Sequence, residues 1–272
     1  MNNALAELTQ SSDCHSVQVA EIIRKDPSLT TRLLRLVNSV YTGLQTPVDD
    51  LETAVFYLGI RGIRHLSLST RLIDDLSDLP GLTSDVDWRQ LWKHSISAGY
   101  LSREILSLYG SASTSDMDYL VGLLHNVGKI VMAYAFKDEF AETLTWKTKD
   151  TQQFAEKEMR AFGWDHSDAG GEYLRLHGLA EEIIAAVKWH NNPSEAGPYA
   201  HYAAAAQVAD VLVRYSGIDS SVEDLDPVAT DSWLELDGWK ILFPDNSSKT
   251  RIAQASLKSS IERIPMILQG MV

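Results

Sequence analysis

Cysteine is scarce in this chain, because Cys14 is the only one among its 272 residues. A single cysteine excludes an internal disulfide framework and is typical of proteins from a reducing compartment. No apolar run approaches the roughly 20 residues that a membrane-spanning helix requires. The N-terminal residues also lack the basic segment and apolar core of a secretory signal. We therefore expect a cytoplasmic protein that makes no use of a membrane.

Positive charge is also scarce, since 24 Lys and Arg residues stand against 37 Asp and Glu residues, for a net charge of -13. Binding to a nucleic-acid backbone depends on clustered basic side chains, so we expect no nucleic-acid partner. Residues 1–75 are nearly neutral, with 7 basic and 9 acidic side chains. Arg61 and Arg64 share a helix face there, which is more typical of a solvated surface than of a binding patch.

Sustained alternation of strand type is absent, and almost the whole chain shows the apolar spacing of amphipathic helices. We expect helices at about residues 17–25, 27–37, 51–58, 60–73, 88–108, 116–126, 130–136, 137–147, 151–162, 167–176, 179–190, 199–215 and 247–268. Short helical pieces are expected around Trp233 and Trp239, within an acidic, loop-like stretch at residues 218–246. Asp50 can cap the helix at 51–58, and the helix at 199–215 is rich in alanine, which lets it pack closely against its neighbours. The prediction is an all-α, multi-helix bundle with short connections between antiparallel neighbours.

Histidines provide the chemistry that the sequence suggests, although a lone histidine on a helix is usually structural. We interpret four of the eight in that way: His15, His65, His177 and His201. The remaining four and one aspartate fall on different predicted helices or, for His166, in the turn that leads into one: His94, His125, His166, His190 and Asp210. Imidazole and carboxylate groups from different helices of a bundle are one established way to hold a transition metal.

The segment Gly122–Lys129 is the centre of this prediction, because it places Asn126 directly after His125. Successive residues lie about 100° apart on a helix, so both side chains reach one ion only where the helix ends or distorts. Val127 and Gly128 supply such an end. Lys129 follows about one short turn later, in a position to meet an anionic ligand. Asn126 and Lys129 are therefore the candidate catalytic residues.

These segments resemble the HD superfamily of metal-dependent phosphohydrolases, whose motif runs H…HD…H…HH…D. The matching segments are LLHNVGK, GWDHSDAG, WHNNP and AAQVAD. The chain is more similar still to the HDOD family, the HD-related output domains of bacterial signalling proteins. That similarity rests on DPSLTTRLLRLVNSVY, LETAVFYLGIRGIRHL and LWKHSISAGYLS.

The resemblance implies a division of the chain and a set of metal ligands. Residues 1–215 would form the HDOD domain, with an N-terminal helical lobe at about 1–82 packed on an HD-domain-like lobe at 83–215. Residues 216–272 would form a C-terminal helical extension. The implied ligands of one divalent transition metal (Fe, Mn, Zn or Ni) are His94, His125, Asn126, His166, His190 and Asp210.

Two departures from the motif bear on function. Asn126 stands where active enzymes have an aspartate that binds and bridges metal ions, and Asn191 stands where a second consecutive histidine is expected. An asparagine offers a neutral carbonyl oxygen, which balances no charge and is a poor bridge between two cations. We therefore expect at most one ion, held by His94, His125 and Asp210 with His166 or His190. A two-metal catalytic clamp is not expected.

Three hypotheses follow. The resemblance implies a regulatory module without catalysis, which would contact unidentified signalling proteins in trans; nothing in the sequence indicates its oligomeric state. The second hypothesis is an active phosphohydrolase on a nucleotide or cyclic dinucleotide, with metal-dependent attack of water on phosphorus and Lys129 stabilising the developing charge. In the third, the histidines belong to a packed polar core, and the protein is a scaffold with no small-molecule site.

Overall fold

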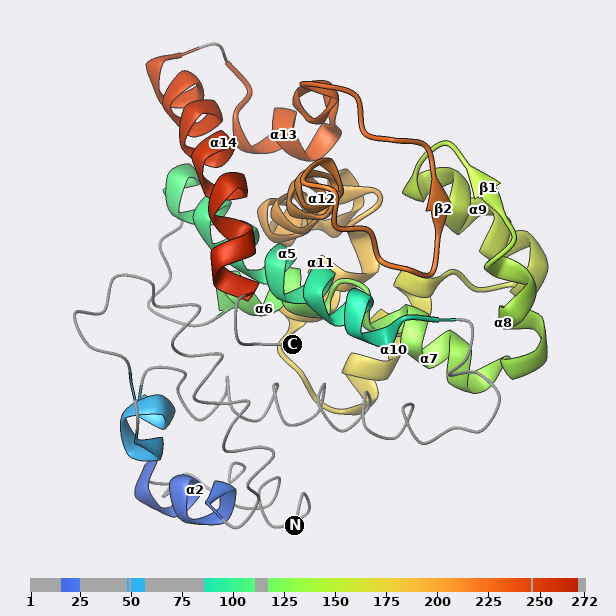
Figure 1. Ribbon diagram of the computed structural model, residues 1–272, viewed down its shortest axis with the longest axis horizontal. Coiled ribbons are helices and arrows are strands. Elements are labelled where there is room, and N and C mark those ends of the chain that lie inside the picture. The colour runs from blue at the N-terminus through green and yellow to red at the C-terminus, as the bar shows by residue number, and fades with distance from the viewer. Residues whose placement is uncertain are drawn as a thin grey trace.

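The computed structural model describes residues 16–24, 48, 50–56, 86–110, 117–245 and 247–268, most of them helical (Figure 1). The α-helices are α2 (Ser16–Ile23), α5 (Trp88–Tyr109), α6 (Met117–Leu124), α7 (Val127–Ala135), α8 (Lys137–Thr143), α9 (Thr151–Phe162), α10 (His166–Leu176), α11 (Glu181–Trp189), α12 (Ala200–Tyr215), α13 (Asp237–Leu242) and α14 (Ser248–Leu268). Residues 51–56 are also helical. The predicted all-α class is confirmed.

Two short 3₁₀ helices and two short strands complete the described elements: η1 (Pro193–Tyr199), η2 (Ser232–Glu235), β1 (Lys147–Thr148) and β2 (Asp224–Leu225). Within the described residues, the search for a helix long and apolar enough to cross a membrane finds none. The helices predicted at 27–37 and 60–73, with Arg61 and Arg64, lie outside the described residues.

Aspartate side chains mark where several helices begin. The carboxylates of Asp87, Asp150 and Asp165 accept hydrogen bonds of 2.8 to 3.1 Å from backbone N–H groups in the first turns of α5, α9 and α10. Asp50 does the same for the helix at residues 51–56, as predicted. Such caps satisfy N–H groups that have no partner within the helix. They fix the helix starts, and hence the position of His166 as the first residue of α10.

The bundle is arranged around α5 and α12. Helix α5 packs against α6, α12 and α14, while α10 packs against α7 and α11 (Figure 1). The alanine-rich face predicted for α12 is confirmed, since Ala203 to Ala206 and Ala209 are fully buried. Trp233 is also fully buried, with its ring edge-on to Trp239 at 4.8 Å between centroids. The segment after α12 is therefore part of the same core.

Two glycines of the segment Gly122–Lys129 bring helices unusually close together. A Cβ atom on Gly122 would lie 2.3 Å from the carbonyl oxygen of Ala98 in α5. A Cβ atom on Gly128 would lie 1.7 Å from the carbonyl oxygen of His166 in α10. Real Cβ atoms do not come that close to backbone. The absence of a side chain at these positions therefore lets α6 reach α5 and α7 reach α10.

Several predicted boundaries were wrong. The helix predicted at 137–147 ends at Thr143, and Lys147–Thr148 pair in parallel with Asp224–Leu225. Thr145, Trp146 and Thr148 have β-branched or aromatic side chains, which favour extended backbone over helix. Helix α7 begins at Val127 rather than 130, and α6 ends at Leu124 rather than 126. His125 and Asn126 form the turn between them, so the helix ends before Val127 and Gly128, which were predicted to end it and instead begin α7.

Candidate metal centre

The structure brings the four predicted histidines and the aspartate together. His94 comes from α5, His125 from the turn between α6 and α7, His166 from the start of α10, His190 from the end of α11, and Asp210 from α12. All five are buried, with at most 3% of the residue surface exposed. Ligand atoms of His94, His125 and Asp210 lie within 4.8 Å of one another.

The Nδ1 atoms of all four rings face hydrogen-bond acceptors. Their partners are Ile218 O for His94 at 3.0 Å, Gly122 O for His125 at 2.6 Å, Val187 O for His190 at 2.7 Å and Glu158 Oε2 for His166 at 2.5 Å. Backbone carbonyls and carboxylates only accept hydrogen bonds, so each Nδ1 carries the proton. In each neutral ring the lone pair is then on Nε2, the form in which histidine binds a metal.

The Nε2 atoms converge on other electron-rich atoms. Asp210 Oδ1 lies 3.0 Å from His94 Nε2 and 3.4 Å from His125 Nε2. The Nε2 atoms of His166 and His190 lie 3.4 Å apart. Two lone pairs at such distances repel each other unless a proton or a cation lies between them. The donor set therefore fits one divalent transition metal.

The titration properties of the buried groups agree with this fit. Burial lowers the pKa of His125, and burial together with the charge of His166 lowers that of His190 further. Burial opposes ionisation of Asp210, but Arg214 and the two nearby histidines hold its pKa well below the usual value. Asp210 is thus charged while His125 and His190 are neutral, which is the protonation state that metal binding requires.

Glu158 fixes the orientation of His166. Its Oε2 accepts from both the backbone N–H and the Nδ1–H of His166, at 3.0 and 2.5 Å, and both residues are fully buried. Burial by itself would lower the pKa of His166, but the charge of Glu158 outweighs it and raises that pKa. A carboxylate behind a histidine makes the ring a more basic ligand and holds its direction.

Two buried ion pairs lie beside the centre, Arg214–Asp210 and Lys129–Glu223. Arg214 donates from Nη2 to Asp210 Oδ2. Lys129 Nζ lies 2.6 Å from Glu223 Oε1, and each of these two side chains is only 1% exposed. Burial would raise the pKa of Glu223, yet Lys129 and Arg214 lower it. The charge of Lys129 is therefore already balanced, and an anionic ligand would compete with Glu223 for it.

Three residues beside the centre were not predicted: Arg214, Glu158 and Glu223. Arg214 stands one helical turn after Asp210, a spacing that pairs opposite charges on one helix face. Glu158 lies one turn after Phe154 and Ala155 in the buried stripe of α9, where a charged residue is unexpected. Glu223 lies in an acidic loop, and nothing in its sequence context distinguishes it.

The two asparagines occupy different surroundings. Asn126 is 2% exposed, and its Nδ2 has no hydrogen-bond partner among the described residues. Asn191 donates from Nδ2 to Ser167 Oγ at 2.9 Å and approaches His166 Nε2 at 3.5 Å. Asn191 thus contributes an N–H donor beside the cluster, whereas a histidine would have contributed a lone pair.

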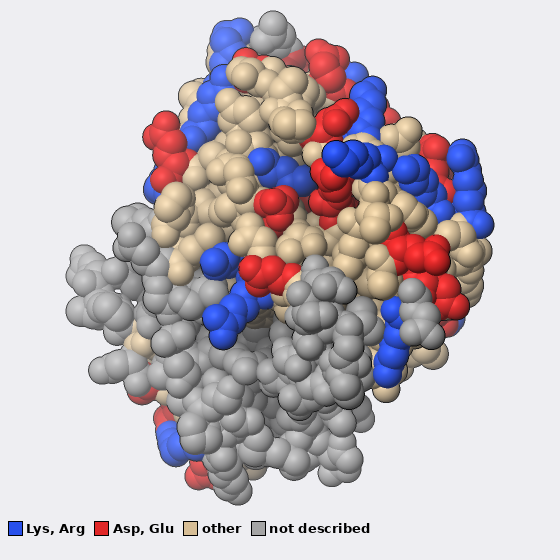
Figure 2. Space-filling view, turned by 45° about the vertical axis from the view of Figure 1, so that its right-hand side comes forward, with Lys and Arg blue, Asp and Glu red and all other residues tan. Residues whose placement is uncertain are grey.

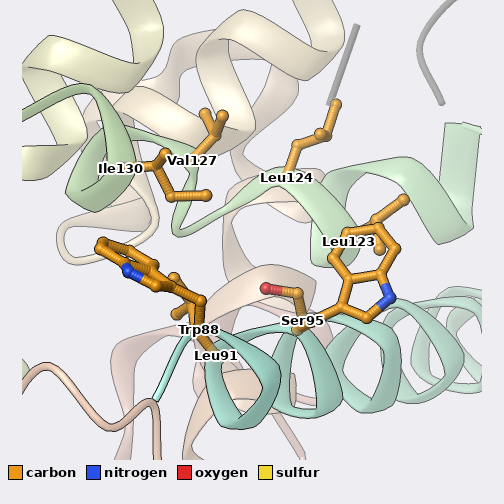
Figure 3. A pocket seen from close by; sticks show the side chains of 8 residues that line it. Trp88, Leu91, Ser95, Leu123, Leu124, Val127 and Ile130 are labelled. Atoms are coloured by element: carbon orange, nitrogen blue, oxygen red, sulfur yellow. The ribbon is translucent and has the colours of Figure 1, made fainter. Parts of the chain in front are cut away.

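Within the part of the chain that the structure describes, two of the cavities lie near the centre, and neither has a histidine of the cluster in its wall. In the first, of about 20 Å³, Trp88 and Leu91 of α5 face Val127 and Ile130 of α7 (Figure 3). That volume accommodates about one water molecule. The second, of about 220 Å³, is polar and is lined by the loop after α12. On the face in Figure 2, acidic and basic side chains are interspersed, with no extended area of one sign.

Comparison with known proteins identifies similar chains. The HDOD domain family matches residues 1–193. A protein from Treponema pallidum (strain Nichols) is 25% identical over 232 residues, which are 81% of this chain and 43% of that protein. The chain therefore spans less than half the length of this relative.

Solved structures share the fold at lower identity. An HDOD domain protein from Geobacter sulfurreducens has a TM-score of 0.70 and 22% identity, over 100% of this chain and 91% of that chain. A candidate phosphohydrolase from Shewanella amazonensis has a TM-score of 0.66 and 19% identity, over 98% and 93%. A candidate signal-transduction protein from Marinobacter aquaeolei has a TM-score of 0.65 and 19% identity, over 98% and 57%.

Proposed function

The chain belongs to the HDOD domain family, and we propose that it is a non-catalytic regulatory module of bacterial signal transduction with a closed, single-metal centre. Its partners would be signalling proteins that it contacts in trans. The Marinobacter protein supports this role, because it carries a signal-transduction name and the matched region is only 57% of its length. The fold would then act as a unit that partners recognise.

Closure of the centre is the observation that carries the proposal. Each of the five donors is at most 3% exposed, and none of them lines either of the cavities described above. Catalytic metal sites keep a position open for water or substrate, whereas structural sites are closed by protein ligands. Burial of the whole donor set therefore favours a metal that stabilises the bundle.

His94, His125 and Asp210 would hold the ion, with His166 or His190 completing the set. A bound divalent ion supplies Lewis acidity in enzymes of the HD superfamily. In this chain its main effect would be to link α5, the α6–α7 turn and α12. Because a metal site does not exist in the unfolded chain, the free energy of metal binding contributes directly to folding.

Asn126 argues against a two-metal centre. A second ion needs a bridging anionic ligand, and the neutral amide of Asn126 is a poor one. Asp210 is already paired with Arg214, and Lys129 with Glu223. The charges nearest the centre are thus largely compensated before any substrate arrives.

Turnover assays test the proposal. The full chain would be supplied in turn with Mn²⁺, Fe²⁺, Ni²⁺ and Zn²⁺ and offered phosphomonoesters and cyclic dinucleotides. We expect no hydrolysis above that of the matched variant His125→Gln. Hydrolysis that His125→Gln abolishes would overturn the non-catalytic assignment, because it would originate at this centre.

The second candidate function is an active phosphohydrolase, and one observation favours it: all four histidines and Asp210 lie in one continuous buried cluster, in which each ring contacts the next. In that case Lys129 would leave Glu223 to stabilise charge on a phosphate ester.

The scaffold hypothesis makes a different prediction, since a packed polar core would bind no metal. Metal content therefore separates the scaffold from the other two functions, and turnover separates those two from each other.

A further inference from the structure

The segment that follows α12 forms one wall of the centre. We call residues 217–227 the strap; they run from the end of α12 to the strand pair β1–β2 (Figure 1). The carbonyl oxygen of Ile218 accepts from His94 Nδ1 at 3.0 Å, and Glu223 reaches inward to Lys129. Among the described residues, the other walls are helices and the α6–α7 turn. Because all five donors are buried, anything that reaches them in the folded chain must displace either helices or the strap.

Few interactions hold the strap in place. Strand β2 pairs only two residues with β1, and the N–H of Asp226 donates to Thr148 O at 3.1 Å. A further hydrogen bond of 3.1 Å joins the N–H of Asp87 to Ser221 Oγ, but Ser221 has a φ of +61°, which strains a residue with a Cβ atom. Val222 is the only buried apolar side chain of the strap, which also borders the cavity of about 220 Å³. Segments with so few buried contacts open locally before the rest of a fold.

The helices around the centre are held more firmly. Helix α5 packs along α6 and α12, and α10 packs along α7 and α11. Gly122 and Gly128 leave no room for even a Cβ atom against the backbones of α5 and α10. Displacing a helix would therefore break many close contacts at once, whereas displacing the strap breaks few. Of the described elements around the centre, the strap requires the least free energy to move.

Lys129 Nζ and Glu223 Oε1 form a latch between α7 and the strap. They lie 2.6 Å apart, and each side chain is 1% exposed. Removal of water from the two charges offsets much of their attraction, so the pair does not prevent the intact strap from opening. Neutralising one partner has a larger effect, because the other charge is then buried without a partner. Only opening of the strap returns that charge to water.

We propose that the strap is a gate that controls access to the metal centre, with the Lys129–Glu223 pair as its latch. Gly217, which has a φ of +88°, supplies a hinge at the end of α12. Closure also places the Ile218 carbonyl that keeps the proton of His94 on Nδ1 and leaves Nε2 for a metal. The inference rests on the closed centre of the proposed function and adds its regulation: whatever holds the strap shut favours retention of the ion.

Chemical modification of His94 in the metal-free full chain tests the gate. Diethyl pyrocarbonate modifies neutral imidazole, and His94 is fully buried while the strap is closed, so mass spectrometry of the modified chain measures opening. We expect Glu223→Gln to be modified at His94 at least about tenfold faster than the wild type. Glu235→Gln, which makes the same exchange at a side chain that is 83% exposed, should leave the rate unchanged. Amide exchange in α14, measured in parallel, reports how often the whole chain unfolds.

A disulfide across the strand pair locks the gate in a second variant. Lys147 and Asp224 are partners in the β1–β2 register, and both side chains are exposed. Neighbouring strands lie about 4.8 Å apart, which is within the range of Cα separations that a disulfide spans. The variant Lys147→Cys, Asp224→Cys would also carry Cys14→Ser, so that no other thiol competes. We expect its oxidised form to be modified at His94 at least about tenfold more slowly than the same protein after reduction and removal of the reductant.

Access to His94 must change by more than global unfolding does. The gate is supported if, in both variants, the change in the His94 rate exceeds the change in α14 amide exchange. It is overturned if the two change by the same factor, if Glu223→Gln reacts as the wild type does, or if the disulfide has no effect. Modification of His94 needs no metal, so this result is independent of metal content and of turnover, which test the proposed function.

Discussion

Asn126 has a neutral amide where an aspartate would have a carboxylate. The exchange removes one negative charge that could otherwise stabilise a bound metal ion. We predict that Asn126→Asp raises the affinity for a divalent ion by about tenfold or more, since a nearby anion stabilises the ion in a poorly solvated site. Competition with a chromophoric chelator measures the change. Asn192→Asp is the matched control, because it makes the same exchange at an exposed position that follows His190 in the sequence. Equal affinities for the wild type and Asn126→Asp would show that residue 126 is not a ligand.

Glu158 acts one step further from the ion, through His166. Replacing it by glutamine keeps the size of the side chain but removes the charge that raises the pKa of His166. We predict a lower His166 pKa and a loss of about 10- to 100-fold in metal affinity, as for other carboxylates behind histidine ligands.

Imidazole NMR titration of the metal-free protein would follow the His166 pKa in the Glu158→Gln variant. The control is Glu156→Gln on the same helix, where the side chain is 55% exposed. An unchanged His166 pKa in Glu158→Gln would contradict the orienting role of Glu158.

At the scale of elements, close helix contacts set the geometry of the centre. We predict that Gly128→Ala destabilises the fold by several kcal/mol, because its Cβ would overlap the backbone of His166. Gly163→Ala is the control. Gly163 has a φ of +73° and open space around it, so alanine there costs about 1 kcal/mol of backbone strain. Chemical denaturation compares the two, and equal losses would contradict the packing argument.

Helices and their caps could be predicted from the sequence because the causes are local. Asp50 caps its helix as expected, and the apolar stripes of α5, α9 and α14 gave boundaries within a residue or two. The end of α8 at Thr143 could not be predicted, since it depends on β1 pairing with a strand far along the chain. The parallel pair also fixes the loop that carries Glu223, which explains why the Lys129–Glu223 pair was missed.

At the scale of the whole molecule, the buried histidines link stability to pH. His125 and His190 have lowered pKa values in the folded chain against an ordinary value of 6.5. Below that value the unfolded chain binds more protons, so the free energy of unfolding falls as the pH falls. His166, with a raised pKa, acts in the opposite sense. The free energy of unfolding should therefore depend on pH as if about one histidine with a lowered pKa were buried.

We predict that metal-free protein loses about 1 to 2 kcal/mol of stability between about pH 7.5 and about pH 5.5. Urea unfolding at the two pH values, in the presence of a chelator, measures this loss. His190→Gln should lose most of this pH dependence, because the remaining effects of His125 and His166 oppose each other. Stability that rises on acidification would contradict the assignment of neutral, buried His125 and His190.

The clustering of the four histidines and Asp210 could be predicted from the sequence because they match an ordered motif, but their surroundings could not. Arg214, Glu158 and Glu223 reach the cluster only through the folded arrangement of α9, α12 and the following loop. Those residues compensate much of the charge near the centre. The burial of the five side chains and this compensation of charge could therefore be recognised only in the folded structure. The single-metal prediction rests on both kinds of observation.

Metal stoichiometry tests the central claim most directly. The full chain would be reconstituted with excess Zn²⁺ or Mn²⁺, freed of unbound ions, and analysed for metal and protein content together. We predict about one ion per chain, reduced to near zero in the double variant His94→Gln, Asp210→Asn. Two ions per chain would contradict the single-metal centre, and no bound ion would show that the histidines form a packed polar core.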